Sequence, residues 1–99
     1  MRIIAIEKEI GAPDREAYLP HLKAEARRVL ELQQSDLLRE IYFRADRHEA
    51  VLILECRDTE HAREVLDSLP LVQAGLIDFE IIPLAPYTGF ERLIKGDMQ

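Results

Sequence analysis

The sequence predicts one α+β domain, in which two helices cover one face of a four-stranded antiparallel sheet. Two observations lead to this prediction. Residues 37–56 read as a hairpin, with alternating strands at 37–44 and 49–56 and a polar turn at 45–48. One strand pattern and one helical pattern also lie on each side of this hairpin. At 99 residues the chain has room for one core, and a second copy would add buried surface.

The two faces of the predicted hairpin differ in character. In-register pairing places on one face Leu37, Arg39, Ile41, Phe43, Ala50, Leu52, Leu54 and Cys56. It places on the other face Leu38, Glu40, Tyr42, Arg44, Glu49, Val51, Ile53 and Glu55. Because the first face is almost entirely apolar, we expect helices to cover it. The mixed face suits a semi-polar pocket or a subunit contact.

The first strand is predicted from Arg2 to Glu9, and the turn residues 11–14 end it. A helix follows at residues 22–34, with apolar side chains at helical spacing. Its start is open, because Pro20 is comfortable only in a first turn: either a short turn at residues 14–19 precedes the helix, or the helix begins near Pro20. The apolar stripe of this helix also contains Glu25.

After the hairpin, a second helix is expected to begin at Asp58 or Thr59 and to end near Leu69, where Pro70 stops it. Residues 71–75 read as a connection. Residues 76–84 form the last predicted strand, in which Ile77, Phe79 and Ile81 share one face.

The tail, residues 86–99, is too apolar for a free chain end. Tyr87, Phe90, Leu93 and Ile94 follow one another at roughly helical spacing. We therefore expect the tail to dock, either on its own subunit or on a neighbouring one.

The order strand, helix, strand, strand, helix, strand is the ferredoxin-like arrangement, which we assign to residues 1–85. Both helices then lie on one face of the sheet, and the mixed face stays bare. We expect a second copy to cover it, which makes a homodimer, a dimeric α+β barrel with a chamber between two sheets.

The composition restricts the partners and the cofactors. A net charge of −6 argues against nucleic acid, and no apolar run reaches the length of a membrane span. The chain begins directly in a strand pattern without a signal peptide, so we expect a cytoplasmic protein. Cys56 has the position of a small core residue, which argues against redox chemistry. Without a glycine-rich phosphate loop, we expect no nucleotide cofactor.

Glu25 and Arg39 are the two charged residues on the apolar surfaces that should meet. One interpretation is a buried structural ion pair, in which losing one partner would cost about 3 to 5 kcal/mol. The other is a catalytic pair, in which Glu25 removes a proton beside a carbonyl and Arg39 stabilises the resulting negative charge. Burial would raise the pKa of Glu25, and a nearby Arg39 would lower it.

Further candidates for binding a small molecule lie on the mixed face: Tyr42, Arg44, Glu40 and Glu55, together with Glu7 and Glu80. The alternative is that this face is solvated or contacts a second copy of the chain. Tyr42 and Arg44 donate hydrogen bonds, which suits an anionic or carbonyl-bearing ligand. His21 lies four residues before Glu25 on the same helical face. The pair has no third ligand at metal spacing, so we expect no metal site.

Several short segments, in this order, resemble the muconolactone isomerase family: residues 31–33 leading into Arg39, Arg47 in the turn, Val51 and Ile53, residues 69–71, and residues 79–85. Glu25 and Arg39 also match. The resemblance implies a dimeric α+β barrel, assembling further in some members, that catalyses a cofactor-free proton shift within an unsaturated lactone. The alternative is a barrel of the same fold that binds a small molecule or serves in an assembly without catalysis.

Overall fold

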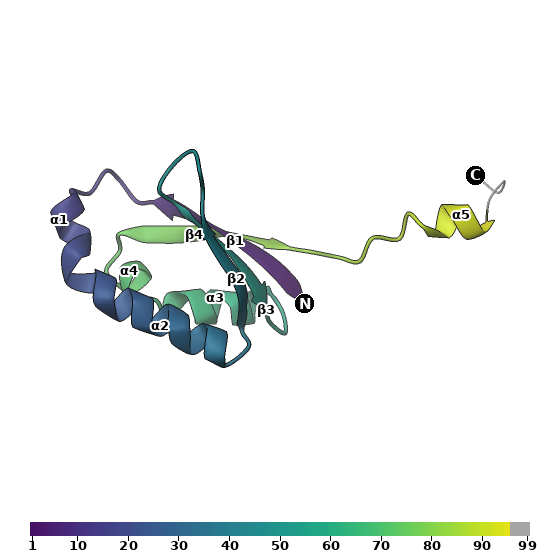
Figure 1. The fold of residues 1–99 in the computed structure, drawn as a ribbon, viewed down its shortest axis with the longest axis horizontal. Helices are drawn as coiled ribbons and strands as arrows, with labels where there is room; N and C mark the ends of the chain where they lie inside the picture. The colour runs from purple at the N-terminus through teal and green to yellow at the C-terminus, as the bar shows by residue number, and fades with distance from the viewer. Residues whose placement is uncertain (96–99) are drawn as a thin grey trace.

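The computed structural model describes residues 1–95. Four strands form one antiparallel sheet in the order β2-β3-β1-β4: β1 (Arg2–Glu9), β2 (Leu38–Phe43), β3 (Ala50–Glu55) and β4 (Ile77–Pro83). The two main helices, α2 (Leu22–Gln34) and α3 (Thr59–Asp67), lie on one side of the sheet (Figure 1). The predicted α+β class and ferredoxin-like order are confirmed.

The helical layer also contains two short helices. A short helix α1 (Arg15–Tyr18) and a 3-10 turn (Leu19–His21) precede α2, so the first of the two predicted starts is right. Helix α4 (Pro70–Gln73) lies where we predicted a connection, because proline is well suited to a first helical position. Within residues 1–95, no helix is both long enough and apolar enough to cross a bilayer.

Helix α3 begins as its sequence predicts. The Asp58 side chain accepts a hydrogen bond from the backbone N–H of His61 at 2.8 Å, which satisfies one of the free amide groups of the first turn.

The core lies between the sheet and this helical layer. It consists of buried residues from every strand and from α2, α3 and α4: Ile3, Ala5, Leu32, Leu38, Ala50, Leu52, Leu54, Cys56, Ala62, Val65, Leu66, Leu69, Leu71, Ile77 and Phe79. The prediction that Cys56 is a core residue is confirmed. Burial also raises the pKa of its thiol.

A β-bulge changes the predicted register at the start of β2. Leu38 pairs with Leu54 and Glu40 pairs with Ile53, so Arg39 is an extra residue between the two pairs. Leu38 therefore faces the core and is buried, while Arg39 is exposed. The predictions that Arg39 lies on the covered face and Leu38 on the mixed face are wrong, because simple alternation assumes an unbroken two-residue period. From Glu40 onward the predicted faces are right.

The face of the sheet away from the helices is the open face. Cross-strand pairing brings together on it five aliphatic side chains, half-buried in the single chain: Ile4, Ile6, Val51, Ile53 and Ile82. Tyr42 and Glu80 end one row of this face, and Glu40 ends the next. This is the mixed face that the sequence predicts.

The chain after β4 leaves the body of the protein. We call residues 85–95 the C-terminal arm; it ends in the short helix α5 (Glu91–Lys95) and projects away from the sheet (Figure 1). The longest dimension of the chain is consequently 60 Å. Residues 96–99 of the predicted docking tail lie outside the described residues.

Candidate active site

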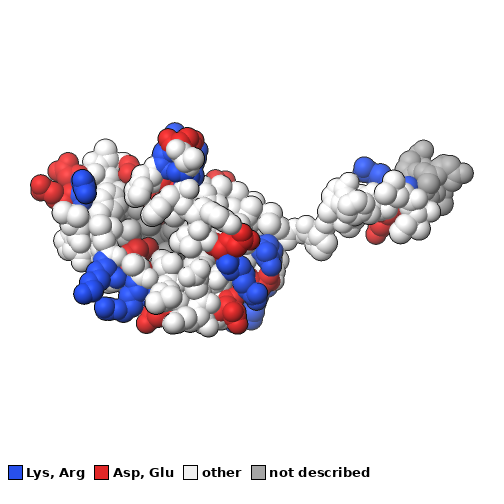
Figure 2. All heavy atoms as spheres, in the orientation of Figure 1, with Lys and Arg blue, Asp and Glu red and all other residues white. Residues whose placement is uncertain are grey.

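A cavity of about 820 Å³ lies between the helical layer and the covered face of the sheet. It is at the end of the sheet where β1 ends and β4 begins, and the surface is hollowed there (Figure 2). Most of its lining is apolar: Pro13, Leu22, Ala26, Val29, Ile41, Phe43, Ala50, Leu52, Leu69, Leu71 and Phe79. The polar lining residues are Glu7, Glu9, Arg15, Tyr18, Glu25, Tyr42 and His48. An apolar cavity with a few polar groups is the usual form of a small-molecule site.

Glu7 enters the cavity from the sheet. It follows Ala5 on the covered face of β1 and pairs with Phe79 of β4. Its Oε1 accepts a hydrogen bond from the backbone N–H of Ala50 at 3.0 Å, just beyond the last β1–β3 pair, Ile6 with Val51. Burial raises the pKa of the Glu7 carboxyl above its ordinary value, although this hydrogen bond opposes the effect.

Glu25 enters the cavity from the first turn of α2. Its Oε1 accepts a hydrogen bond from the backbone N–H of Leu71 at 2.9 Å, near the start of α4. Burial raises the pKa of Glu25, while this hydrogen bond and the charge of His21 act in the opposite direction. The carboxylate thus joins α2 to α4 and also faces the cavity.

Glu7 and Glu25 share the cavity, and neither has an ion-pair partner within residues 1–95. The charge of Glu25 further raises the pKa of Glu7, so the two groups interact. Half-buried carboxylates with raised pKa values in one cavity are typical of acid/base sites.

Tyr18 adds a hydrogen-bond donor to the same cavity. Its hydroxyl oxygen is buried and makes no hydrogen bond of the usual geometry among the described residues, although the Glu9 carboxylate is close enough for a weak interaction that raises the pKa of Tyr18. Burial and the charges of Glu9 and Glu7 raise the pKa of Tyr18, so the hydroxyl keeps its proton. A buried donor without a partner is costly unless a ligand or water uses it.

No protein-family model matches the sequence, and no curated protein matches it. The fold does match solved structures. Over 89% of this chain and 92% of the other, it superposes on muconolactone isomerase with a TM-score of 0.73 at 17% identity. The chain has the muconolactone isomerase fold. A 5-chloro-2-hydroxyhydroquinone dehydrochlorinase from Burkholderia phenoliruptrix AC1100, solved with 2,5-dihydroxybenzoquinone, shares it with a TM-score of 0.66 and 11% identity, over 88% and 97% of the two chains.

The two residues of the predicted pair, Glu25 and Arg39, lie apart in this fold. Glu25 lies in the cavity, whereas Arg39 is exposed at the bulge of β2, where its Nε donates to the carbonyl oxygen of Asp36 at 3.0 Å. No ion pair within residues 1–95 joins Glu25 and Arg39. The predicted contact between them is wrong, because the bulge turns Arg39 away from α2.

The other predicted site residues are spread over the surface. Tyr42 borders the cavity at the edge strand and donates its hydroxyl to Glu40. Arg44 binds both carboxylate oxygens of Asp46 in the hairpin turn, at 2.9 and 2.6 Å. Of these residues only Tyr42 reaches the cavity.

Three further candidates lie apart from the cavity lining. Glu55 lies at the other end of the sheet, where its carboxylate accepts from the N-terminal ammonium at 2.7 Å and from Arg2 at 3.2 Å. Glu80 is exposed on the open face. The charge of His21 lowers the pKa of Glu25, but His21 is not among the residues that line the cavity. Within residues 1–95, no cluster of His, Cys, Asp or Glu could hold a metal ion.

From the sequence we placed the catalytic pair on the covered side of the sheet and the other binding candidates, including Glu7, on the mixed face, and we gave Tyr18 no role. The placement of Glu7 on the mixed face is wrong, because Glu7 lies on the covered face of β1 together with Ala5. The sequence did contain a signal for the positions of Glu7 and Tyr18. Tyr18, Leu22, Glu25 and Val29 follow one helical stripe, and Glu7 shares a strand face with Ala5. The covered face and the stripe meet in the structure, which brings Glu7, Tyr18 and Glu25 into one cavity.

Arg39→Ala is expected to change the free energy of unfolding by no more than about 0.5 kcal/mol, because the side chain is exposed and has no ion pair in the described structure. Urea denaturation of the two proteins measures this difference. A loss of about 3 to 5 kcal/mol would instead indicate the buried ion pair that the sequence suggested.

Glu7 and Glu25 should make the protein less stable as the pH rises. Because both pKa values are raised in the folded state, folding binds protons between the unfolded and the folded pKa, so stability falls through that window. The double variant Glu7→Gln, Glu25→Gln lacks this loss. As the pH rises, its free energy of unfolding should therefore increase relative to that of the wild type. The free energy of unfolding of the exposed control Glu64→Gln should change with pH as that of the wild type does.

Proposed function

We propose that the protein is a small cofactor-free enzyme that moves a proton within an unsaturated lactone or a related carbonyl compound. The observation that carries this proposal is the pair of carboxylates in an apolar cavity, neither of which has an ion-pair partner within residues 1–95. A carboxylate with a raised pKa, held close to its ligand, is suited to general acid/base catalysis near neutral pH.

In the proposed reaction, Glu25 takes a proton from the carbon next to the ligand's carbonyl group. The electron pair of that C–H bond moves into the carbonyl, and the Tyr18 hydroxyl donates a hydrogen bond to the resulting enolate oxygen. Glu7 on the sheet side, protonated at the start, then gives its proton to a distant carbon, and transfer of the proton from Glu25 to Glu7 restores both groups to their starting states. The double bond shifts, and the ligand neither gains nor loses atoms.

The names of the two structural neighbours support this class of reaction. One is an isomerase that acts on muconolactone, and the other is a dehydrochlorinase. Removal of hydrogen and chlorine also requires a base that takes a proton. A cavity with one raised-pKa carboxylate could serve either reaction, so the proposal concerns the proton transfer rather than a particular substrate.

The alternative is a cavity that binds a small molecule without catalysis. The hydrogen bonds from Ala50 and Leu71 favour it, because they give both carboxylates a structural role. Deuterium exchange separates the two functions. The protein is incubated in D₂O with muconolactone and a panel of unsaturated lactones, and proton NMR follows the ligand. If the protein is a catalyst, we expect the proton signal of the carbon beside the carbonyl to disappear and the double bond to move. Ligand line broadening without exchange would support the binding protein.

We further propose that two copies pair through their open faces. The five aliphatic side chains there are half-buried in one chain, and the pairing would bury them completely. Ile53→Asp, at the centre of this face, should shift the protein toward monomer in sedimentation velocity, whereas the exposed control Leu30→Asp should not. A wild-type protein that is monomeric at every concentration would refute the pairing.

A further inference from the structure

We propose that the cavity takes an uncharged carbonyl compound and disfavours one that carries a carboxylate or another anionic group. This inference rests on the proposed function, since it names the charge of the substrate that the same cavity would take.

The acidic side chains of the cavity come from two elements. Strand β1 contributes Glu7 and Glu9, and helix α2 contributes Glu25. Glu7 and Glu25 are half-buried beside apolar side chains, where water screens a charge less than it does at the surface. Glu25 is ionised in the proposed reaction because it acts as the base, and Glu9 places a further carboxylate at the exposed margin of the cavity.

Cationic side chains are scarce in the described lining. One arginine and no lysine line the cavity, and this arginine is Arg15 of α1. Arg15 is exposed and takes part in no ion pair within residues 1–95, so the surrounding water weakens the field of its charge. His48 is exposed as well, and its ring stacks on Phe43.

The charges around Glu7 agree with this description. Burial is the main cause that raises the pKa of Glu7. Among the charges near it, Glu49 raises this pKa more than His48 lowers it, and Glu25 raises it further. The surroundings of Glu7 therefore disfavour an additional negative charge.

Helix α2 shows how the basic residues are kept out of the cavity. The helix contributes four lining residues, of which only the acidic one is charged: Leu22, Glu25, Ala26 and Val29. Its basic residues lie outside the lining. Lys23 and Arg27 are exposed, and the Nε of Arg28 donates to Oγ of Ser68 at 2.9 Å. The helix thus offers the cavity a base and apolar surface, without a cation that could bind an anionic group.

A carboxylate on the ligand would be costly in this arrangement. It would leave water for an apolar cavity in which the described lining supplies no buried cation. It would also lie near Glu25, and like charges raise each other's pKa, so protonation would remove the base. An uncharged carbonyl compound avoids both costs, and its oxygen can accept a hydrogen bond from the Tyr18 hydroxyl.

A ligand with an ammonium group is the remaining alternative. The carboxylates would attract it, but a cation beside Glu25 would lower the pKa of that carboxyl and make it a weaker base. Such a ligand suits an inhibitor rather than a substrate. The uncharged compound is the one that leaves Glu25 both free and basic.

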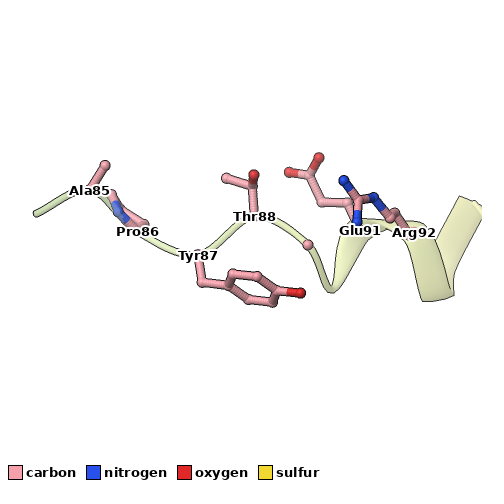
Figure 3. A pocket seen from close by; sticks show the side chains of 7 residues that line it. Ala85, Pro86, Tyr87, Thr88, Glu91 and Arg92 are labelled. Atoms are coloured by element: carbon pink, nitrogen blue, oxygen red, sulfur yellow. The ribbon is translucent and has the colours of Figure 1, made fainter.

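A second hollow, of about 540 Å³, lies on the C-terminal arm and contains an arginine, Arg92. Tyr87 projects there from the opposite side of the arm to Thr88 and Glu91 (Figure 3). Because residues of the arm alone form this hollow, an anion that Arg92 attracts would stay in contact with water. Arg92→Gln therefore controls for anion binding outside the cavity.

Two unreactive ligands that differ in charge test the inference. Both are saturated five-membered lactones with a side chain that ends in a carboxylate in one compound and in a primary carboxamide in the other. Neither has a double bond that can shift. Ligand-observed NMR titration measures both affinities for the wild type and for the double variant Glu7→Gln, Glu25→Gln. The double variant Glu60→Gln, Glu64→Gln is the matched control, because it removes two exposed carboxylates of α3 outside the cavity.

In the wild type, the carboxamide should bind at least about tenfold more tightly than the carboxylate, and the cavity double variant should reduce this ratio at least about threefold. The α3 control and Arg92→Gln should keep the wild-type ratio. Equal affinities, binding of neither compound at millimolar concentration, or a ratio that the cavity variant leaves unchanged would overturn the inference. Tighter binding of the carboxylate that is lost in Arg15→Gln would overturn it too, and would identify Arg15 as the group that binds an anion.

These affinities are independent of turnover. If the carboxamide is preferred but no lactone exchanges deuterium, the charge preference stands and the proposed catalysis fails. If lactones exchange deuterium but the carboxylate is preferred, the catalysis stands and the charge preference fails.

Discussion

Glu25→Gln is expected to slow deuterium exchange at the ligand carbon by roughly 10²- to 10⁴-fold, the usual contribution of a general base. The free energy of unfolding should stay the same or rise slightly. A glutamine oxygen can still accept the hydrogen bond from Leu71, and the variant no longer places a charge in an apolar cavity. The change therefore removes the base and leaves the connection between α2 and α4 intact.

Urea denaturation and the exchange rate are measured on the same preparations, with Glu64→Gln as the matched control on an exposed helix position. The control should match the wild type in both measurements. Exchange that continues at the wild-type rate in Glu25→Gln would exclude Glu25 as the base. If both the rate and the stability collapse, the carboxylate is needed for folding, and the catalytic role loses its support.

Leu54→Ala is expected to lower the free energy of unfolding by about 2 to 5 kcal/mol, which is a large part of the stability of a domain of this size. Leu54 has no exposed surface, and it lies opposite Ile3 and Leu38 in the closed part of the core. Close packing there leaves little room for neighbours to fill the space of the lost side chain.

Leu30→Ala is the control for this variant, because Leu30 is 52% exposed on α2 and its truncation should cost no more than about 0.5 kcal/mol. Thermal unfolding followed by circular dichroism compares the two variants. Equal costs for Leu54→Ala and Leu30→Ala would contradict the division between core and surface described here.

The sequence was sufficient to predict the elements, because hydrophobic period and turn residues act locally. Alternation gave β1 and the hairpin, and Asp58 marked the start of α3. The sequence was not sufficient to predict which face Arg39 lies on. A bulge inserts one residue into a strand, and a period-two pattern does not reveal where this happens. The consequence was large, since the predicted ion pair with Glu25 depended on that single register position.

The location of the cavity also could not be predicted from the sequence. Periodicity shows which faces of an element are apolar, and we therefore placed the binding candidates other than Glu25, Arg39 and His21 on the mixed face. It does not show where two apolar faces fail to meet. Here the helical layer and the sheet separate at one end, and the gap contains Glu7 and Glu25 rather than a closed core. Only the packing of α2 and the short helices against the sheet determines that gap.

Glu7 and Glu25 share an apolar cavity, and neither has an ion-pair partner within residues 1–95. This arrangement is tested most directly by carbon-13 NMR titration of the side-chain carboxyl groups in the intact chain, with Glu7→Gln and Glu25→Gln to assign the signals. We expect both pKa values to lie above that of an ordinary glutamate, and we expect Glu7 to titrate at lower pH when Glu25 is replaced. Values at or below the ordinary glutamate pKa, or no coupling between the two groups, would contradict this arrangement.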